Sequence, residues 1–176
     1  HALLGPIEAL RRRTGGILGP DAAWLLQRSF PTMDLRIDAA QQAAAQLAAA
    51  LAEDVAAGRL EQVIYPGSND HPDHALVARQ MTGGGTMVSF VVPGGLACAL
   101  RVYDRFRVIA RAPSLGSVES LASLPAYTTH APLTPEQRRE AGIPDGLLRI
   151  AVGLEGSPVL LADIRQALAA AGGIAR

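Results

Sequence analysis

The sequence predicts an α/β protein, and three observations support this class. From residue 61 onward, short apolar runs bounded by glycine and proline alternate with helical segments, as expected for a sheet covered by helices. Before them, residues 34–58 are rich in alanine and glutamine and predict one long helix. Hydrophobic residues make up 49% of the chain, which is enough to form a core.

The residues before the long helix contain weaker signals. Residues 1–18 have no capping residue before their apolar positions, and we expect them to be the end of a preceding domain. A helix is predicted from Pro20 to Arg28, because proline suits the first helical turn. Pro31 should then interrupt the helical structure.

The long helix is the clearest element in the sequence. We expect Asp34 or Asp38 to cap its beginning and Gly58 to mark its end. Its apolar positions recur every four residues and form one face, consisting of Leu47, Leu51 and Val55.

The remaining elements follow from apolar runs separated by turn residues. Strands are predicted at residues 61–65, 86–92, 107–110 and 147–154. Helices are predicted at residues 72–80, 96–103, 135–141 and 157–171. Ser157 should cap the last helix and Pro158 should open it. Residues 112–134 contain clusters of Ser, Thr, Pro and Gly and are predicted to be a loop.

Composition limits the functional classes. The 16 basic and 16 acidic residues give a formal net charge of +0, so we expect no nucleic-acid partner. No apolar stretch reaches the roughly 18 to 20 residues of a transmembrane helix, and the N-terminus lacks a secretory pattern. We therefore expect a cytoplasmic protein with no membrane partner. The single cysteine, Cys98, is predicted to be a small buried hydrophobic residue.

The absence of lysine has a chemical consequence. All 16 basic residues are arginine. A Schiff base requires a primary amine that can lose its proton, whereas arginine remains protonated. This chain by itself therefore forms no lysine Schiff base.

Two motifs are weak candidates for sites. Residues 83–85 are three glycines that could bind phosphate, but they precede a strand, where a flexible connection is the favoured interpretation. His71 and His74 could share a metal ion, but they lack a third ligand. A surface loop is favoured for them, and we predict no metal site.

Arg149 is a stronger candidate because it lies within an apolar predicted strand. It shares a face with Leu147 and Ala151, two residues away on each side. A guanidinium in that position requires an anionic partner. The pattern leaves two partners open, a protein acid such as Glu155 or the carboxylate of a substrate.

Four segments of the sequence form a recognisable set. They are residues 26–36, residues 63–67 with 85–90, residues 114–121 with Pro125, Thr129 and His130, and residues 142–155, which read GIPDGLLRIAVGLE. Together they resemble the C-terminal half of the transsulfuration enzymes, which use pyridoxal phosphate (PLP). This family includes cystathionine γ-synthases, cystathionine lyases, methionine γ-lyases and homoserine sulfhydrylases. The third and fourth segments are the specific ones.

The resemblance implies a fold and a site. The expected fold is the small C-terminal domain of a fold-type-I PLP enzyme, with a mostly antiparallel sheet covered by helices. Arg149 would bind the substrate α-carboxylate, with Ser114 and Leu115 on the substrate side of the pocket. Thr129 would lie behind these residues, and Glu119 would order the loop. No residue of this chain is expected to bind the cofactor directly.

The resemblance also implies an organisation and partners. Residues 1–33 would end the large PLP-binding domain, residues 34–58 would form the connecting helix, and residues 59–176 would form the C-terminal domain. The partners would be an amino-acid substrate, the N-terminal PLP-binding portion or subunit, and further copies in a homotetramer.

Two departures from the family pattern and several alternatives stay open. Pro31 stands where the family usually has a helix-compatible lysine, and Pro113 stands where enzymes acting on cystathionine often have glutamate, which weakens cystathionine as the substrate. The parent enzyme could be a C–S lyase or an O-acyl-homoserine sulfhydrylase-type transferase. The chain could instead be a degenerate, non-catalytic module for binding or subunit association, or a plain α/β interaction domain.

Overall fold

The computed structural model describes residues 3–172. His1 belongs to the expected tail and lies outside the described residues. The chain divides into two compact units, with the boundary between Leu35 and Arg36. We describe each unit by itself.

The first unit is helical. It contains α1 (Leu4–Thr14), α2 (Pro20–Ser29) and the 3₁₀ turn η1 (Phe30–Thr32). The helix predicted from Pro20 is confirmed, whereas α1 was not predicted. The predicted interruption at Pro31 is limited to one 3₁₀ turn, after which helical structure resumes directly. No residue of α1, α2 or η1 is buried.

The long helix α3 extends from Met33 to Ala56. Asp34 lies in its first turn, but Asp38 lies inside the helix, so the prediction that Asp38 could cap it is wrong. The predicted end is confirmed, because Gly58 adopts a left-handed φ of 70° just beyond the last helical residue.

The second unit contains one sheet of five strands. They are β1 (Gln62–Ile64), β2 (Met87–Val91), β3 (Ala110–Arg111), β4 (Leu121–Ser123) and β5 (Leu147–Ala151). Their order is β1-β2-β5-β4-β3, and every pair is antiparallel except β3 with β4. The predicted mostly antiparallel sheet is therefore confirmed.

One strand prediction and one loop prediction were wrong. The strand predicted at residues 107–110 is displaced to β3, because the carboxylate of Asp163 accepts the backbone N–H groups of Arg107, Val108 and Ile109. These amides are thereby removed from any sheet ladder. The loop predicted at residues 112–134 contains β4, which is only three residues long.

Four helices accompany the strands, and they are α4 (His74–Gln80), α5 (Gly95–Tyr103), α6 (Pro135–Glu140) and α7 (Ser157–Ala170). The prediction that Ser157 caps α7 was wrong. The cap position is Gly156, and the Ser157 hydroxyl donates instead to Oε1 of Gln46 at 2.6 Å. This bond links the beginning of α7 to α3.

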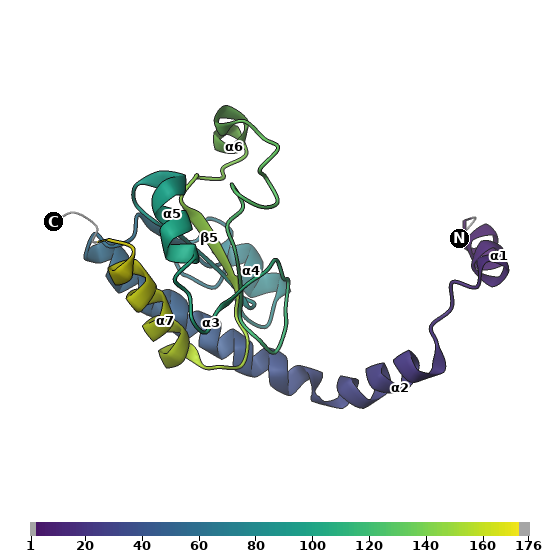
Figure 1. Cartoon of the computed structure of the whole chain (residues 1–176). Helices are drawn as coiled ribbons and strands as arrows, with labels where there is room; N and C mark the ends of the chain where they lie inside the picture. Colours follow the sequence, from purple (N-terminus) through teal and green to yellow (C-terminus); the bar gives the residue numbers. More distant parts are fainter. Residues whose placement is uncertain (1–2, 173–176) are drawn as a thin grey trace. The chain divides into compact units, whose positions relative to one another are not determined.

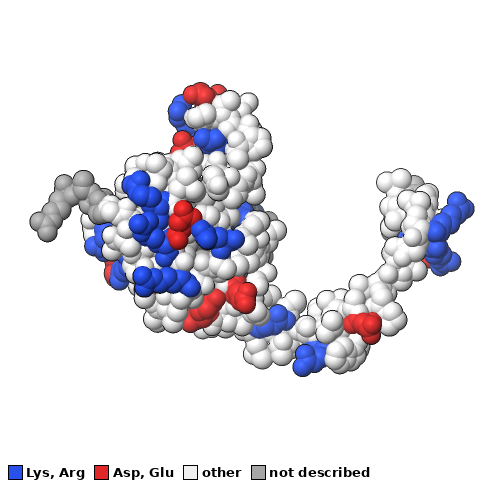
Figure 2. All heavy atoms as spheres, in the orientation of Figure 1, with Lys and Arg blue, Asp and Glu red and all other residues white. Residues whose placement is uncertain are grey.

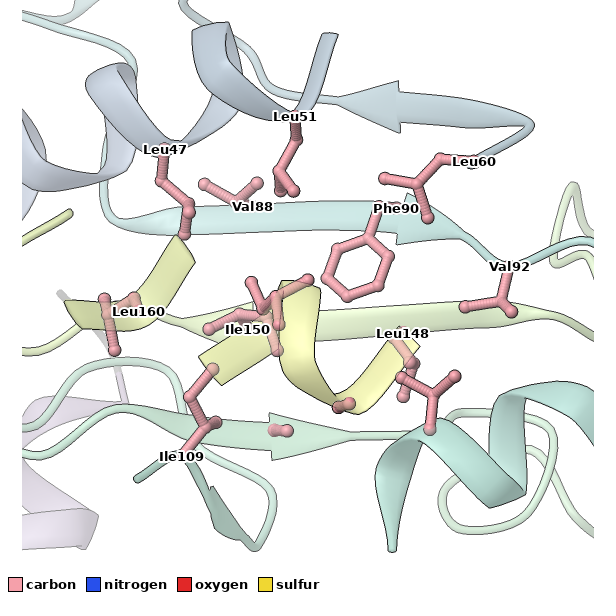
Figure 3. Close-up of a cluster of buried hydrophobic side chains, with 14 of the residues drawn as sticks. Leu47, Leu51, Leu60, Val88, Phe90, Val92, Ile109, Leu148, Ile150 and Leu160 are labelled. Carbon is pink, nitrogen blue, oxygen red and sulfur yellow. The ribbon is translucent and has the colours of Figure 1, made fainter. Parts of the chain in front are cut away.

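Helices α3, α5 and α7 pack on one face of the sheet and form the core. Figure 3 shows Leu47 and Leu51 of α3 directed toward Val88 of β2, beside Ile150 of β5. All four of these side chains are fully buried. The predicted apolar face of the long helix is thus confirmed, and burying such side chains is the main favourable contribution to folding.

A buried polar contact joins two of these helices. Asp54 of α3 is fully buried, and its carboxylate accepts hydrogen bonds from Arg165 of α7 at 3.1 Å and from Arg59 at 2.5 Å. Figure 1 shows α3 and α7 together under the sheet. The second arginine satisfies the remaining carboxylate oxygen, as a buried charge requires.

Charged side chains of both signs are interspersed on the face of the second unit shown in Figure 2. Within the described part of the chain, no helix has the length and apolar character required to cross a bilayer.

Candidate substrate-binding site

Arg149 occupies the middle of β5, the central strand of the sheet. Its neighbours Leu148 and Ile150 are fully buried on the core face. Successive residues of a strand point to opposite faces, so the Arg149 side chain extends from the face that α3 and α7 leave open. The predicted placement of Arg149 on a strand is confirmed.

The guanidinium of Arg149 is incompletely satisfied. One terminal nitrogen, Nη2, donates to the backbone carbonyl oxygen of Ser114 at 3.4 Å, which is long for a hydrogen bond. Nε is buried and has no hydrogen-bond partner. Buried donors are nearly always paired in folded proteins, so an unpaired guanidinium nitrogen indicates a missing acceptor.

Glu155 is excluded as that acceptor. Its Oε1 accepts the backbone N–H of Ser120 at 2.6 Å, and its Oε2 accepts the Ser120 hydroxyl at 2.7 Å. Among the described residues, Arg149 forms no salt bridge. Of the two partners that the sequence left open, Glu155 is therefore wrong, and a substrate carboxylate stays a prediction.

The loop between β3 and β4 contributes Ser114 and Leu115. Ser114 approaches Arg149 through its carbonyl, while its hydroxyl accepts the N–H of Gly116 at 3.1 Å. Leu115 is 82% exposed and makes no core contact. The structure therefore brings Ser114 to Arg149 and leaves Leu115 as an uncovered apolar side chain.

Thr129 and Glu119 form no hydrogen bond to Arg149. The Thr129 hydroxyl lies 2.9 Å from Nδ1 of His130, in the turns that follow β4. Glu119 is exposed, and its backbone N–H donates to the Ser117 hydroxyl at 3.4 Å. Their roles in the site stay predictions.

Two serines that the sequence did not reveal flank Arg149. In the ladder of antiparallel pairs, Ser89 of β2 and Ser123 of β4 both lie directly opposite Arg149. Directly opposite residues share a face, so the Arg149 side chain leaves β5 between two serine side chains. The strand register identifies these serines, and the register could not be inferred from the sequence because β4 was not predicted.

The three glycines at residues 83–85 pack against other residues, and Gly85 forms hydrogen bonds within the protein. The N–H of Gly85 donates to Oε1 of Gln41 at 3.1 Å, and its carbonyl accepts the Tyr65 hydroxyl at 3.1 Å. Burial raises the pKa of Tyr65, which keeps this hydroxyl protonated as a donor. These contacts support the favoured interpretation, a connection into β2, over a phosphate cradle.

The other sequence candidates have local roles. His71 Nδ1 accepts the backbone N–H of Asp73 at 3.1 Å. Within residues 3–172, no group of three His, Cys, Asp or Glu side chains is placed to hold a metal ion. Cys98 is only partly buried, and its sulfur accepts a hydrogen bond from Arg101 at 2.9 Å.

The donor set suits an anion but includes no covalent anchor for PLP. The unpaired Nε of Arg149 requires an anionic acceptor, and the planar guanidinium matches a carboxylate. A covalent anchor for PLP requires a lysine, and the sequence contains none. The chain thus offers a guanidinium that can bind an anion, and it contains no lysine for a covalent link to PLP.

The chain is similar in sequence to curated enzymes. Cystathionine γ-lyase of Bacillus subtilis (strain 168) is 43% identical over 162 residues, which are 92% of this chain and 42% of the relative. L-methionine γ-lyase of Pseudomonas deceptionensis is 43% identical over 164 residues, 93% of this chain and 40% of the relative. The chain thus spans about two fifths of the length of these relatives.

Solved structures and a family model extend the match. The crystal structure of cystathionine γ-lyase from yeast superposes with a TM-score of 0.87 at 37% identity, covering 97% of this chain and 43% of that one. The fold is thereby confirmed as that of the C-terminal part of fold-type-I PLP enzymes. The model for the Cys/Met metabolism PLP-dependent enzymes matches residues 2–169. The chain belongs to this family.

Proposed function

We propose that this chain is the substrate-carboxylate-binding portion of a PLP-dependent enzyme of sulfur amino-acid metabolism. The reaction would be C–S elimination or γ-replacement on cysteine or homoserine derivatives. One observation carries the proposal: Nε of Arg149 is buried, unpaired and directed away from the core. Membership of the family supports the class of reaction.

Arg149 would orient the substrate. Its planar guanidinium can hold a carboxylate through two parallel hydrogen bonds, which fixes both the position and the plane of the amino acid. The strand on which it stands is paired on both sides, so the anchor moves little. PLP, when bound by the rest of the enzyme, supplies the electron sink for the bond that breaks.

The two serines opposite Arg149 would complete this anchor. Ser89 and Ser123 can each donate a hydroxyl proton to a carboxylate held by the guanidinium. Ser123 is almost completely buried, at 2% exposure, so its hydroxyl adds a donor without admitting water. The Ser114 carbonyl oxygen would hold the arginine on its outer side.

The domain division at residues 33 and 58 and the N-terminal partner are part of the same proposal. Every described residue of the first unit is exposed, including many large apolar side chains such as Trp24, Leu26 and Phe30. An apolar surface of this kind requires a cover. We assign that cover to the large PLP-binding portion, because the chain spans only about two fifths of its relatives. A homotetramer and the cofactor requirement belong to that whole enzyme.

The test is replacement of Arg149 in the full-length enzyme. Arg149→Ala should raise KM for the amino-acid substrate on the order of 100-fold, because a buried, charge-assisted pair is lost. Arg149→Lys should recover little, since an ammonium cannot bind a carboxylate in the same bidentate way. Arg139→Ala is the matched control, because Arg139 is exposed on the short helix α6.

A substrate analogue sharpens this test. Replacing the substrate carboxylate by a carboxamide should weaken binding to the wild-type enzyme strongly, and should weaken binding to Arg149→Ala much less. If both enzymes lose the same factor, Arg149 does not contact the carboxylate and the proposal is wrong. If the holoenzyme turns over no sulfur amino acid, the chain is the non-catalytic module instead.

The preferred substrate would lack a second ammonium group. Pro113 precedes Ser114 and is exposed, and its side chain offers no acceptor. Pro113→Glu should therefore increase kcat/KM for cystathionine relative to methionine.

A product assay distinguishes a lyase from a transferase. With an O-acyl-homoserine and an added thiol as substrates, a lyase releases a keto acid, whereas a transferase forms a new thioether.

A further inference from the structure

The loop that contributes Ser114 is fastened to the chain that follows β5. Glu155 accepts both the backbone N–H and the hydroxyl of Ser120, at 2.6 and 2.7 Å. The same hydroxyl oxygen accepts the backbone N–H of Gly153 at 2.8 Å. The backbone N–H of Leu154 donates to the carbonyl of Val118 at 2.9 Å. We call this set of contacts between residues 118–120 and 153–155 the loop clamp.

The loop clamp is buried at its centre and tightly packed. Ser120 is fully buried. A Cβ atom added to Gly153 would lie 2.5 Å from the Val118 carbonyl oxygen and 2.7 Å from the Ser120 nitrogen, so only glycine permits this approach. Because the contacting atoms belong to backbone, neither segment can shift to make room.

Glu155 provides the charge in the loop clamp. Among the described residues it forms no salt bridge, and both of its carboxylate oxygens are used by Ser120. Hydrogen bonds to an ionised acceptor are about twice as strong as those between neutral groups. A glutamine at this position could not accept both bonds, because its amide nitrogen is a donor.

The rest of the loop depends on its two ends. At the first end, the N–H of Ala112 donates to the carbonyl of Ala122 at 3.0 Å. Between the ends, residues 115–119 are exposed, and apart from the contact of Val118 with Leu154 they are held by the local turns at Gly116 and Glu119. The 3.4 Å contact between Ser114 and Arg149 is too long to fix the loop by itself.

We propose that Glu155 is a positioning residue for the Arg149 site. By clamping Ser120, it holds the loop so that the Ser114 carbonyl reaches Arg149 and keeps the guanidinium turned toward an incoming carboxylate. This inference rests on the proposed function of Arg149. The role that the sequence assigned to Glu119, ordering the loop, would then belong to Glu155.

The test compares four variants of the full-length holoenzyme. Glu155→Gln and Ser120→Ala should each raise KM for the amino-acid substrate about tenfold, with kcat changed less than about threefold. Glu155→Asp keeps the charge on a shorter side chain and should recover part of the lost affinity. Glu140→Gln, which removes an exposed charge on α6, is the matched control and should leave KM unchanged.

Hydrogen exchange supplies a readout that does not depend on activity. Peptides covering residues 114–120 and 153–155 should exchange faster in Glu155→Gln, while peptides of β2 keep the wild-type rate. An unchanged exchange rate and KM in Glu155→Gln would overturn the proposal. It would equally be overturned if Glu119→Gln, rather than Glu155→Gln, produced these effects, or if exchange rose uniformly across the domain.

The two proposals can fail separately. If Arg149→Ala leaves KM unchanged, the carboxylate role is wrong whatever Glu155 does. If Arg149→Ala raises KM steeply and Glu155→Gln leaves both KM and loop exchange unchanged, only the positioning role is wrong.

Discussion

The carboxylate of Asp163 accepts the backbone N–H of Ile109 at a distance of 2.9 Å, and both residues are buried. The same carboxylate accepts the N–H groups of Arg107 and Val108, so three consecutive amides converge on one side chain of α7. This arrangement replaces a strand ladder with a single acceptor, and it holds the chain that enters β3 against the helix.

Replacement of Asp163 should destabilise the second unit. Asp163→Asn keeps the size of the side chain but removes one acceptor oxygen and the charge, so we predict a loss of about 2–4 kcal/mol in the free energy of unfolding. Asp104→Asn, on the exposed end of α5, is the control and should change this value by less than about 0.5 kcal/mol. Urea unfolding measures both. Equal values for the two variants would contradict the prediction.

The stabilisation by Asp163 should depend on pH. Burial alone raises the pKa of Asp163, but the hydrogen bonds from Ile109, Arg107 and Val108, with a smaller one from Gln166, outweigh it and leave the pKa below its ordinary value. A carboxylate with a lowered pKa in the folded state stabilises above its unfolded pKa of about 3.9. The difference in unfolding free energy between wild type and Asp163→Asn should therefore be constant above about pH 5 and decrease as the pH falls below about 4.

Gly84 should tolerate alanine less well than its neighbour Gly83. A Cβ atom on Gly84 would lie 2.6 Å from backbone atoms of Gly67, whereas one on Gly83 would meet only the end of the flexible Gln41 side chain. We predict a loss of about 1–3 kcal/mol for Gly84→Ala and a smaller loss for Gly83→Ala. Thermal unfolding compares the pair. A larger effect at Gly83 would show that the close approach of the two glycine backbones is not a constraint.

Arg138 and Arg139 are adjacent but should differ sharply on replacement. Arg138 is buried, and it donates to Asp145 at 2.8 Å and to the carbonyl of Leu133 at 2.6 Å, whereas Arg139 is exposed. Arg138→Ala leaves two acceptors without their donor, and we predict a loss of about 2–4 kcal/mol. Arg139→Ala should stay within about 0.5 kcal/mol. Similar losses for both variants would assign the effect to the helix propensity of α6 rather than to the buried contacts.

The sequence predicted those elements whose signals are local. The apolar spacing of Leu47 and Leu51 identified the buried face of α3, and the alternation around Arg149 placed a charge on a strand. Both patterns repeat over a few residues, which is the range in which side-chain periodicity carries information.

The failures arose where a distant partner decides the local structure. Residues 107–109 look like a strand, but Asp163, more than 50 residues away, binds their amides. The serine at the start of α7 has the chemistry of a cap, yet it bonds to Gln46, 111 residues away. Neither pairing leaves a trace in the neighbouring sequence.

The candidate site divides in the same way. Arg149 and Ser114 could be named from the sequence and its resemblance to a family, whereas Ser89 and Ser123 required the register of the strands. Strand β4 is too short to show alternation, so its pairing with β5 becomes visible only in three dimensions.

The position of Arg149 on the middle strand has a consequence for how such enzymes can diversify. The guanidinium of Arg149 stands on the central strand of the sheet. Residues 113–118 form the loop beside it, and this loop is connected to the core only at its ends. Mutations in this loop can change its shape without displacing the Arg149 guanidinium. With the proposed role of Arg149, one inherited anchor for the carboxylate that all amino acids share would serve enzymes whose substrates differ in their side chains.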